Sequence, residues 1–266
     1  MNLVYKYLNF ESPYSIENLR DKLIFLEQGQ AFATYNEFEL EYEMESEADV
    51  KSRLIGEAKR LFQTNYESSL FEWLKLLESN KSNKLILTIE DSMELRAVEL
   101  FKNKKAYEKH TIDRLRNHVR IFSTSKRNNI EKMWKIFSKK HTGFCIGFNE
   151  DYLKNSLGLS SSIVNYYKET KPKIQIMQSE GTYLNIMFSL PKQFNFQEEI
   201  RFLRVFLPGI REQIVENYKV KYDPWCVKEI ILGKNISESN MGIIGKVIFK
   251  DYAHAKLLSS KELLFE

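Results

Sequence analysis

The sequence predicts an α+β fold, in which one domain over residues 1–266 carries a helical insertion at 45–117. Two observations lead to this class. Apolar residues recur at spacings of three and four in the first half of the chain, whereas short strand-like runs dominate the second half. The chain also holds only five prolines and ten glycines, and neither a repeat nor a low-complexity linker divides it. We therefore expect helices inserted between the strands of one domain.

The N-terminal half begins with a predicted strand, LVYKYLNF at 3–10. SIENLRDKLIFLEQG then predicts a short helix with Ser15 as its N-cap, running towards Gly29. Amphipathic spacing predicts two longer helical stretches, from Ala48 to Glu78 and from Asp91 to Asn117. These two stretches form the expected insertion.

The C-terminal half is predicted to be rich in strands. The strand segments are VRIFSTS (119–125), GFCIGF (143–148), SIVNYY (162–167), EEIRFLRVFL (198–207), CVKEIILG (226–233) and KELLFE (261–266). Helices are predicted between them at 127–140, 150–157, 178–190 and 237–247.

Composition excludes several classes of protein. With 43% hydrophobic and 29% charged residues, the chain has globular composition. It holds no run of about 18 apolar residues to span a bilayer, and MNLVYKYLNFESPY lacks the layout of a signal peptide, so we expect a cytoplasmic protein that contacts no membrane. Cys145 and Cys226 lie in separate apolar segments and predict free buried thiols. Four scattered histidines stand at no metal-ligand spacing, so no metal site is predicted.

The charge is unevenly distributed although the net value is only +4. Cations gather at 102–110, 114–120 and 125–129, whereas the stretch 37–47 is acidic. Two interpretations stay open. The cations form either a basic wall for a phosphate-rich ligand or ordinary solvated helix faces.

The segment FQEEIRFLRVFL contains the most informative polar residues. Side chains alternate across a strand, so Gln197, Glu199 and Arg201 are predicted to share one face. Residues two apart on a strand stand roughly 6 to 7 Å apart, close enough for Arg201 to hold Glu199 ionised and oriented. The trio is either an ion pair on a sheet surface or the lining of a cleft.

The segment RIFSTSKRNNIEKMW places three hydroxyl groups at the end of a predicted strand. Alternation puts Ser123 and Ser125 on one side and Thr124 on the other. The two serines are either strand-edge residues or groups that hydrogen-bond a sugar or brace a carboxylate. Trp134, in the following helix, is either a core anchor or a wall of the same site.

Several segments, taken in order, resemble a bacterial domain family of uncharacterised function, about 250 residues long. The matching segments are VYKY, SIENLRDKLIFLEQGQAFATYNEF, FSTS, KMWKIFSKKHTGFCIGF, VNYY, QEEIRF and KEIILG. Serines, Met133-Trp134 and His141-Thr142-Gly143-Phe144 keep the family's order and spacing. The sequence departs from the family at Tyr35-Asn36-Glu37-Phe38, which lacks a proline, and at Gln197, where a glutamate is expected.

The order of a basic strand, a Ser-Thr-Ser strand and a Gln-x-Glu strand is also similar to that of ADP-ribosyltransferases of the arginine, serine, glutamate class. The matching positions are Lys6, Ser123-Thr124-Ser125 and Gln197-Glu198-Glu199. The resemblance implies mixed or antiparallel central sheets like an ADP-ribosyltransferase fold. It also implies that Glu199 stabilises an oxocarbenium-like state next to nicotinamide, that Ser123 supports the ribose and holds Glu199, and that Gln197 positions the acceptor. Lys6 stands where arginine or histidine is usual, and it either binds phosphate or faces away, with Tyr5 or Tyr7 lining the site.

The resulting hypothesis is an ADP-ribosyltransferase-like enzyme that uses NAD as substrate to modify a protein or nucleic-acid acceptor. The resemblance to these two families implies that the protein is a toxin or an effector of a phage-defence system. It also implies partner proteins that belong to the same system. The expected catalytic residues are Glu199 and Gln197. The expected cofactor-binding residues are Lys6, Tyr7, Ser123, Ser125, Arg201, Trp134 and Asn36. The alternatives are a nucleic-acid-binding or nucleic-acid-modifying protein of a defence system, and a catalytically inactive sensor or partner module with the same fold.

Overall fold

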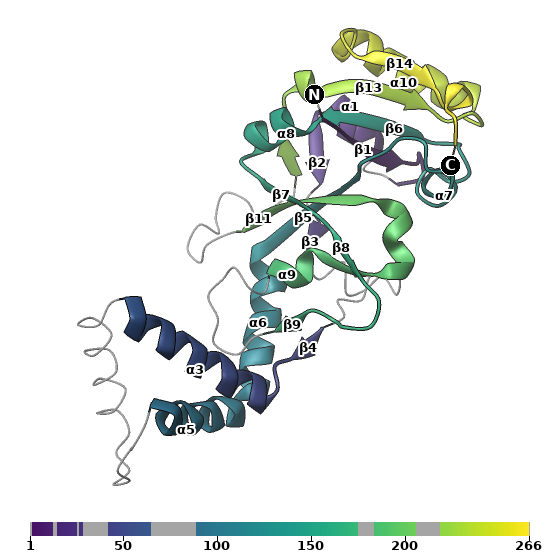
Figure 1. Cartoon of the computed structure of the whole chain (residues 1–266). Helices are drawn as coiled ribbons and strands as arrows, with labels where there is room; N and C mark the ends of the chain where they lie inside the picture. The colour runs from purple at the N-terminus through teal and green to yellow at the C-terminus, as the bar shows by residue number, and fades with distance from the viewer. Residues whose placement is uncertain are drawn as a thin grey trace. The chain divides into compact units, whose positions relative to one another are not determined.

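The computed structural model describes residues 2–12, 15–25, 27–28, 42–64, 89–174, 184–205 and 219–265. The chain divides into two compact units. Unit 1 comprises Met1–Glu41, Arg114–Thr170 and Met187–Glu266, and unit 2 comprises Tyr42–Asp113 and Lys171–Ile186. The range of unit 2 overlaps the predicted insertion at 45–117. Helices and strands occur in both units (Figure 1), which confirms the predicted α+β class.

Unit 1 is built on a mixed sheet whose main strand order is β14-β13-β6-β1-β5-β11-β7, with β3 beside β5 (Figure 1). All of these neighbours are antiparallel except β13 and β14. The bounds are β1 Leu3–Leu8, β3 Glu27–Gln28, β5 Val119–Ser125, β6 Phe144–Asn149, β7 Ser160–Ile163, β11 Glu199–Val205, β13 Val227–Leu232 and β14 Lys256–Ser259.

Short helices and strand pairs complete unit 1. Its helical elements include α1 Ser15–Arg20, α7 Glu131–Ile136, α8 Glu150–Leu157, η1 Lys192–Gln197, η3 Pro224–Cys226, α10 Glu238–Asp251 and η4 Ser260–Glu262. The pair β8 (Asn165–Tyr167) and β10 (Ser189–Pro191) is parallel, and the pair β2 (Leu23–Phe25) and β12 (Lys219–Lys221) is antiparallel. The short helix α9 spans Leu184–Met187, of which only Met187 belongs to unit 1.

The main sheet of unit 1 buries a different core on each face. On what we call the α10 face, Val4, Phe122, Ile146 and Phe202 pack with side chains of α1, α8 and α10, such as Ile244. On the opposite face, which we call the α7 face, the cluster consists of Tyr5, Tyr7, Ile130, Met133, Trp134, Cys145 and Ile231. Successive residues of β1 therefore alternate between the two cores, as a strand covered on both sides requires.

Several predicted elements of unit 1 are confirmed. The segment 119–125 is β5 and the segment 150–157 is α8. The N-cap of α8 is Asn149, whose side chain accepts a hydrogen bond from the Tyr152 amide at 2.7 Å, and its C-cap is Gly158 in the left-handed conformation. Cys145 and Cys226 are free and buried, as predicted.

Other boundaries were wrong. The predicted helix 15–29 ends at Arg20, because Lys22 adopts a positive φ of 57° and the chain continues as β2. The predicted strand 261–266 is absent over its described part: residues 261–262 belong to η4, residues 263–265 form no regular element, and the edge strand β14 lies just upstream. The predicted helix 127–140 is shortened to α7, and 162–167 is divided between β7 and β8.

Unit 2 contains α3 Glu47–Thr64, α5 Ile89–Lys102 and the first part of α6 Lys104–His118, together with the parallel pair β4 Glu43–Met44 and β9 Lys173–Ile174. Its core is a cluster of Val50, Ala97 and Leu100. Helix α3 packs on α5 through this cluster.

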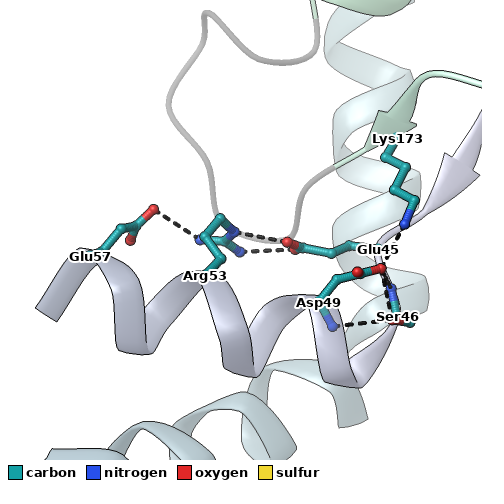
Figure 2. A network of polar contacts seen from close by, with 6 residues as sticks. All are labelled: Glu45, Ser46, Asp49, Arg53, Glu57 and Lys173. Carbon is teal, nitrogen blue, oxygen red and sulfur yellow. Dashed lines mark hydrogen bonds and ion pairs between the residues drawn. The ribbon is translucent and has the colours of Figure 1, made fainter. Parts of the chain in front are cut away.

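A polar network fixes the start of α3 within unit 2 (Figure 2). Arg53 donates two hydrogen bonds to the buried carboxylate of Glu45, both at 2.9 Å. Ser46 and Asp49 hydrogen-bond each other's side chains and backbone amides, in the manner of a capping box. Lys173 of β9 donates to Asp49 Oδ2 at 2.8 Å. The network therefore joins β9 to α3.

None of the helices in the described ranges is long and apolar enough to cross a membrane.

Candidate functional site

The three strands that carry the predicted site are neighbours in the sheet, in the order β1-β5-β11. Glu199 pairs with Ser125 and Arg201 pairs with Ser123 across β5 and β11. Directly opposed residues of an antiparallel pair extend from the same face. Ser123, Ser125, Glu199 and Arg201 therefore lie together on the α7 face of unit 1.

Glu199 and Arg201 form a buried, two-pronged ion pair. The guanidinium donates from Nε to Glu199 Oε1 at 2.8 Å and from Nη2 to Oε2 at 3.2 Å. It also donates from Nη1 to the carbonyl oxygen of Met187, at the end of α9. Arg201 is fully buried and Glu199 is 3% exposed. The pair is therefore part of the interior, unlike an exposed pair on a sheet surface.

The backbone of Glu199 is also anchored. Its amide donates to the hydroxyl oxygen of Tyr166 in β8 at 2.8 Å, and its carbonyl accepts from the Val164 amide at 3.0 Å. Burial raises the pKa of Tyr166 to about 12, so the phenol keeps its proton across physiological pH. Side chain and main chain together hold Glu199 in a single position.

The serine hydroxyls have different surroundings. Ser123 Oγ is buried and, within the described residues, has no hydrogen-bond partner. Ser125 is fully buried and its Oγ accepts a hydrogen bond from the Arg127 amide at 3.3 Å. The resemblance implied that Ser123 holds Glu199, but Arg201 performs that bracing. Ser123 is left with unused hydrogen-bonding capacity beside the ion pair.

Lys6 extends from the α10 face, opposite Glu199. Its Nζ donates to the carbonyl oxygen of Ser123 at 3.0 Å and lies 5.1 Å from the ring centroid of Phe122. Tyr5 and Tyr7 lie on the α7 face instead. The structure therefore separates Lys6 from the predicted site and brings the neighbouring tyrosines to that side of the sheet.

A row of polar residues crosses the α7 face from one carboxylate to another. Register pairs join Glu199 to Ser125, Ser125 to Tyr5, Tyr5 to Gly147 and Gly147 to Glu229. The Tyr5 hydroxyl crosses β6 at Gly147 and donates to Glu229 Oε2 at 3.2 Å. A Cβ atom at Gly147 would stand 3.0 Å from Tyr5 Cε1 and 3.1 Å from Glu229 Cβ, so this crossing depends on glycine. Burial, followed by the charge of Glu229, raises the pKa of Tyr5.

Sequence reasoning missed the contact between Tyr5 and Glu229. The two residues lie at opposite ends of the chain, and only the order of strands β1, β6 and β13 brings them together. The one local signal is Gly147 in the middle of a strand, which is typical of a close approach by another group.

Trp134 and Tyr7 are core residues. Trp134 is fully buried, its Nε1 donates to the Asn128 carbonyl at 2.7 Å, and its ring meets that of Tyr7 edge-on at 5.4 Å. The Tyr7 hydroxyl donates to the carbonyl oxygen of Arg127 at 2.7 Å. For Trp134 the core-anchor interpretation is therefore the one that the structure bears out.

Gln197 is buried, but it ends η1 and does not belong to strand β11 as predicted. The chain enters β11 through Glu198, which adopts a left-handed conformation with φ of 42° and forms an ion pair with Arg127. This turn breaks the alternation on which the predicted Gln-Glu-Arg face rested. Asn36 lies outside the described residues.

The segment from within α7 to within η3, which includes β6 to β11, has a counterpart among known families. Residues 133–225 match the family model described as "Protein of unknown function (DUF2971)". The predicted resemblance to a domain family of unknown function is confirmed over this DUF2971 segment. The segment includes Trp134, Glu199 and Arg201, whereas β1 and β5 lie before it. The chain has no significant match among curated proteins or solved structures.

Several polar groups lie on the α7 face or contact residues of that face. They are an unused hydroxyl at Ser123, a fixed carboxylate at Glu199 and phenol groups at Tyr5 and Tyr166. Over the described ranges, no group of three or more histidine, cysteine or acidic side chains is placed to hold a metal ion. Ser123 Oγ retains the capacity to donate one hydrogen bond beside the carboxylate of Glu199.

Proposed function

We propose that unit 1 is an ADP-ribosyltransferase-like enzyme that binds NAD and transfers ADP-ribose to a protein or nucleic-acid acceptor, as an effector of a defence or toxin system. The observation that supports it best is the register of β5 and β11, which gathers Ser123, Ser125 and Glu199 on one face. This juxtaposition is what a shared site for the nicotinamide ribose requires.

In the proposed reaction, the bond between the ribose C1′ and the nicotinamide nitrogen breaks, and nicotinamide leaves with the electron pair. A lone pair on an acceptor oxygen or nitrogen then forms a bond to C1′, and the acceptor loses a proton. The carboxylate of Glu199 stabilises the developing positive charge, and the Ser123 hydroxyl binds a ribose hydroxyl. Arg201 occupies one acceptor position on each oxygen of Glu199, and a carboxylate has about four, so two remain.

A second candidate is a catalytically inactive sensor or partner module. The observation that favours it is the closed state of Glu199, which is 3% exposed and held on both oxygens by Arg201. The position of Lys6 on the α10 face also removes the cation that would bind the phosphates on the α7 face. This candidate predicts a folded protein that releases no nicotinamide.

The test measures nicotinamide release and label transfer from radiolabelled NAD in cell lysate, with titration calorimetry for NAD binding. Ser123→Ala is the informative variant because Ser123 Oγ makes no hydrogen bond within the described structure, so its loss leaves folding unchanged. Ser239→Ala, an exposed serine of α10 on the opposite face of the sheet, is the matched control. We expect turnover in wild type and in the control, and at least about tenfold weaker turnover in Ser123→Ala, the loss of one or two hydrogen bonds.

Glu199→Gln completes the series, with its folding checked by circular dichroism. Label transfer that is abolished in Glu199→Gln excludes the inactive module. A folded wild-type protein that neither transfers label nor releases nicotinamide excludes the enzyme.

A further inference from the structure

Three lysines of unit 2 form an exposed cationic ridge where α5 meets α6. Lys102 ends α5, and Lys105 and Lys109 lie one turn apart in α6. All three side chains are exposed. At about 1.5 Å rise per residue, Lys105 and Lys109 stand about 6 Å apart along the axis and face the same way. We call these three residues the lysine ridge.

Two acidic residues of the same segment have partners other than the ridge. Glu99 forms an ion pair with Arg96 at 2.7 Å, and Glu108 accepts a hydrogen bond from the Tyr42 hydroxyl at 3.0 Å. No ion pair of the described residues involves a lysine of the ridge. Within the described residues, the three lysines of the ridge thus present their charges to solvent without forming an ion pair.

The neighbouring aromatic residues show which anion the ridge suits. Phe101 and Tyr107 are turned inward, where they pack against the cluster of Val50, Ala97 and Leu100. Ala106, between the lysines, is exposed and small. A helix that lies on a membrane needs a large apolar face beside its cations, and this ridge lacks one. A row of cations without an apolar face suits the phosphates of a nucleic-acid strand.

We propose that the lysine ridge is a docking surface for the phosphate backbone of a nucleic acid. Lysine is a point charge that contacts phosphate without reading sequence, so the surface binds by charge and is insensitive to base order. Phosphates recur about every 3.4 Å along each strand of a duplex, so the length of the ridge meets two or three of them. This inference does not depend on NAD chemistry in unit 1.

The test measures binding of fluorescently labelled duplex and single-stranded oligonucleotides to the full chain by anisotropy over a range of salt concentrations. The ridge variant is Lys102→Gln/Lys105→Gln/Lys109→Gln, since glutamine removes the charge and keeps helix propensity. We expect its affinity for duplex at low salt to fall at least about tenfold. Its slope of log affinity against log salt should decrease in magnitude by up to about 2.7, the value for three phosphate contacts.

The matched control is Lys246→Gln/Lys250→Gln/Lys261→Gln, which removes the same charge from exposed positions of unit 1. We expect it to bind as wild type does. Equal weakening in the two triple variants, or a wild-type protein that binds neither oligonucleotide, overturns the proposal. Loss of binding to anionic phosphatidylserine vesicles in the ridge variant, with oligonucleotide binding unchanged, assigns the ridge to a membrane and also overturns it.

Discussion

Arg201 lies two residues after Glu199 in β11 and hydrogen-bonds both oxygens of its carboxylate. Both side chains are buried. Residues two apart share a face of a strand, so no other element is needed to bring the two charges together. The same guanidinium also donates to the carbonyl oxygen of Met187, in the same unit. Arg201 thus fixes the carboxylate on which the proposed chemistry depends.

Removal of Arg201 alone should destabilise the protein strongly. Arg201→Met leaves the carboxylate of Glu199 buried without its counterion, and we expect the free energy of unfolding to fall by about 3–5 kcal/mol. The double variant Arg201→Met/Glu199→Leu removes both charges and should recover most of that loss. Urea unfolding of wild type, both single variants and the double variant measures the coupling. A double variant that is no more stable than Arg201→Met would contradict this interpretation.

The crossing of Tyr5 over β6 predicts that Gly147 tolerates no side chain. In Gly147→Ala the added methyl group meets Tyr5 and Glu229, and we expect a loss of about 1–3 kcal/mol in the free energy of unfolding. Gly242→Ala is the control, because a Cβ there meets nothing within 4 Å and Gly242 lies inside α10. It should stabilise the protein by about 0.5–1 kcal/mol. Thermal unfolding of the two variants separates overpacking from the general effect of alanine.

Sequence patterns identified the elements whose signals are local. Segment 150–157 has a capping asparagine before it and a glycine after it, and the structure places α8 between them. The helix at 15–29 was overextended because Leu23–Phe25 pairs with residues 219–221, and nothing near Leu23 encodes a partner so distant.

The candidate site was only partly predictable for the same reason. Alternation correctly placed Ser123 with Ser125 and Glu199 with Arg201, since each pair lies within one strand. Which residues of β1 lie on the same face as these pairs depends on how β1 pairs with β5 in the folded sheet. The structure places Tyr5 and Tyr7 on the α7 face with them and Lys6 on the α10 face. Gln197 was misplaced because the left-handed turn at Glu198 interrupts the alternation.

His141 should make stability depend on pH below neutrality. It is 2% exposed, its Nε2 lies 3.0 Å from Glu131 Oε2, its Nδ1 lies 3.4 Å from Ser260 Oγ, and its ring stacks on Trp134. Burial lowers the pKa of His141 below its ordinary value of 6.5. The charge of Glu131 opposes this shift and raises the pKa, whereas the charge of Lys234 lowers it further. The unfolded chain then binds the proton more readily than the folded one. The contribution of neutral His141 to the free energy of unfolding should therefore be fully present above pH 6.5. It should decrease as the pH falls towards the pKa of the folded state.

The matched variant is His141→Asn, because His141 has a φ of 65° and asparagine tolerates that conformation. It should remove the pH dependence between pH 7 and the folded pKa of His141, whereas His254→Asn, at an exposed position, should retain it. Denaturant unfolding at several pH values measures both. A wild-type protein whose stability increases on acidification through this range would contradict the sign.

The polar network at the start of α3 predicts a lowered pKa for the carboxyl group of Asp49. The hydrogen bond from Lys173, followed by those from Ser46, lowers the pKa of Asp49 to about 2 (Figure 2). In Lys173→Met the pKa should rise towards the ordinary value of 3.8, and in Ser46→Ala it should rise by less. A carboxyl carbon NMR titration measures each value. An unchanged pKa in Lys173→Met would mean that β9 does not hold α3 through this contact in solution.

Strand β1 has a consequence for the synthesis of the protein. It lies between β5 and β6, and these partners are formed by Val119–Ser125 and Phe144–Asn149. At about 5–20 residues per second, the ribosome needs on the order of ten seconds to reach Asn149 after β1. During that time an apolar strand with both edges unpaired must stay out of contact with other nascent chains. The order of strands in unit 1 thus leaves β1 without its full pair of partners until more than half of the chain has been synthesised.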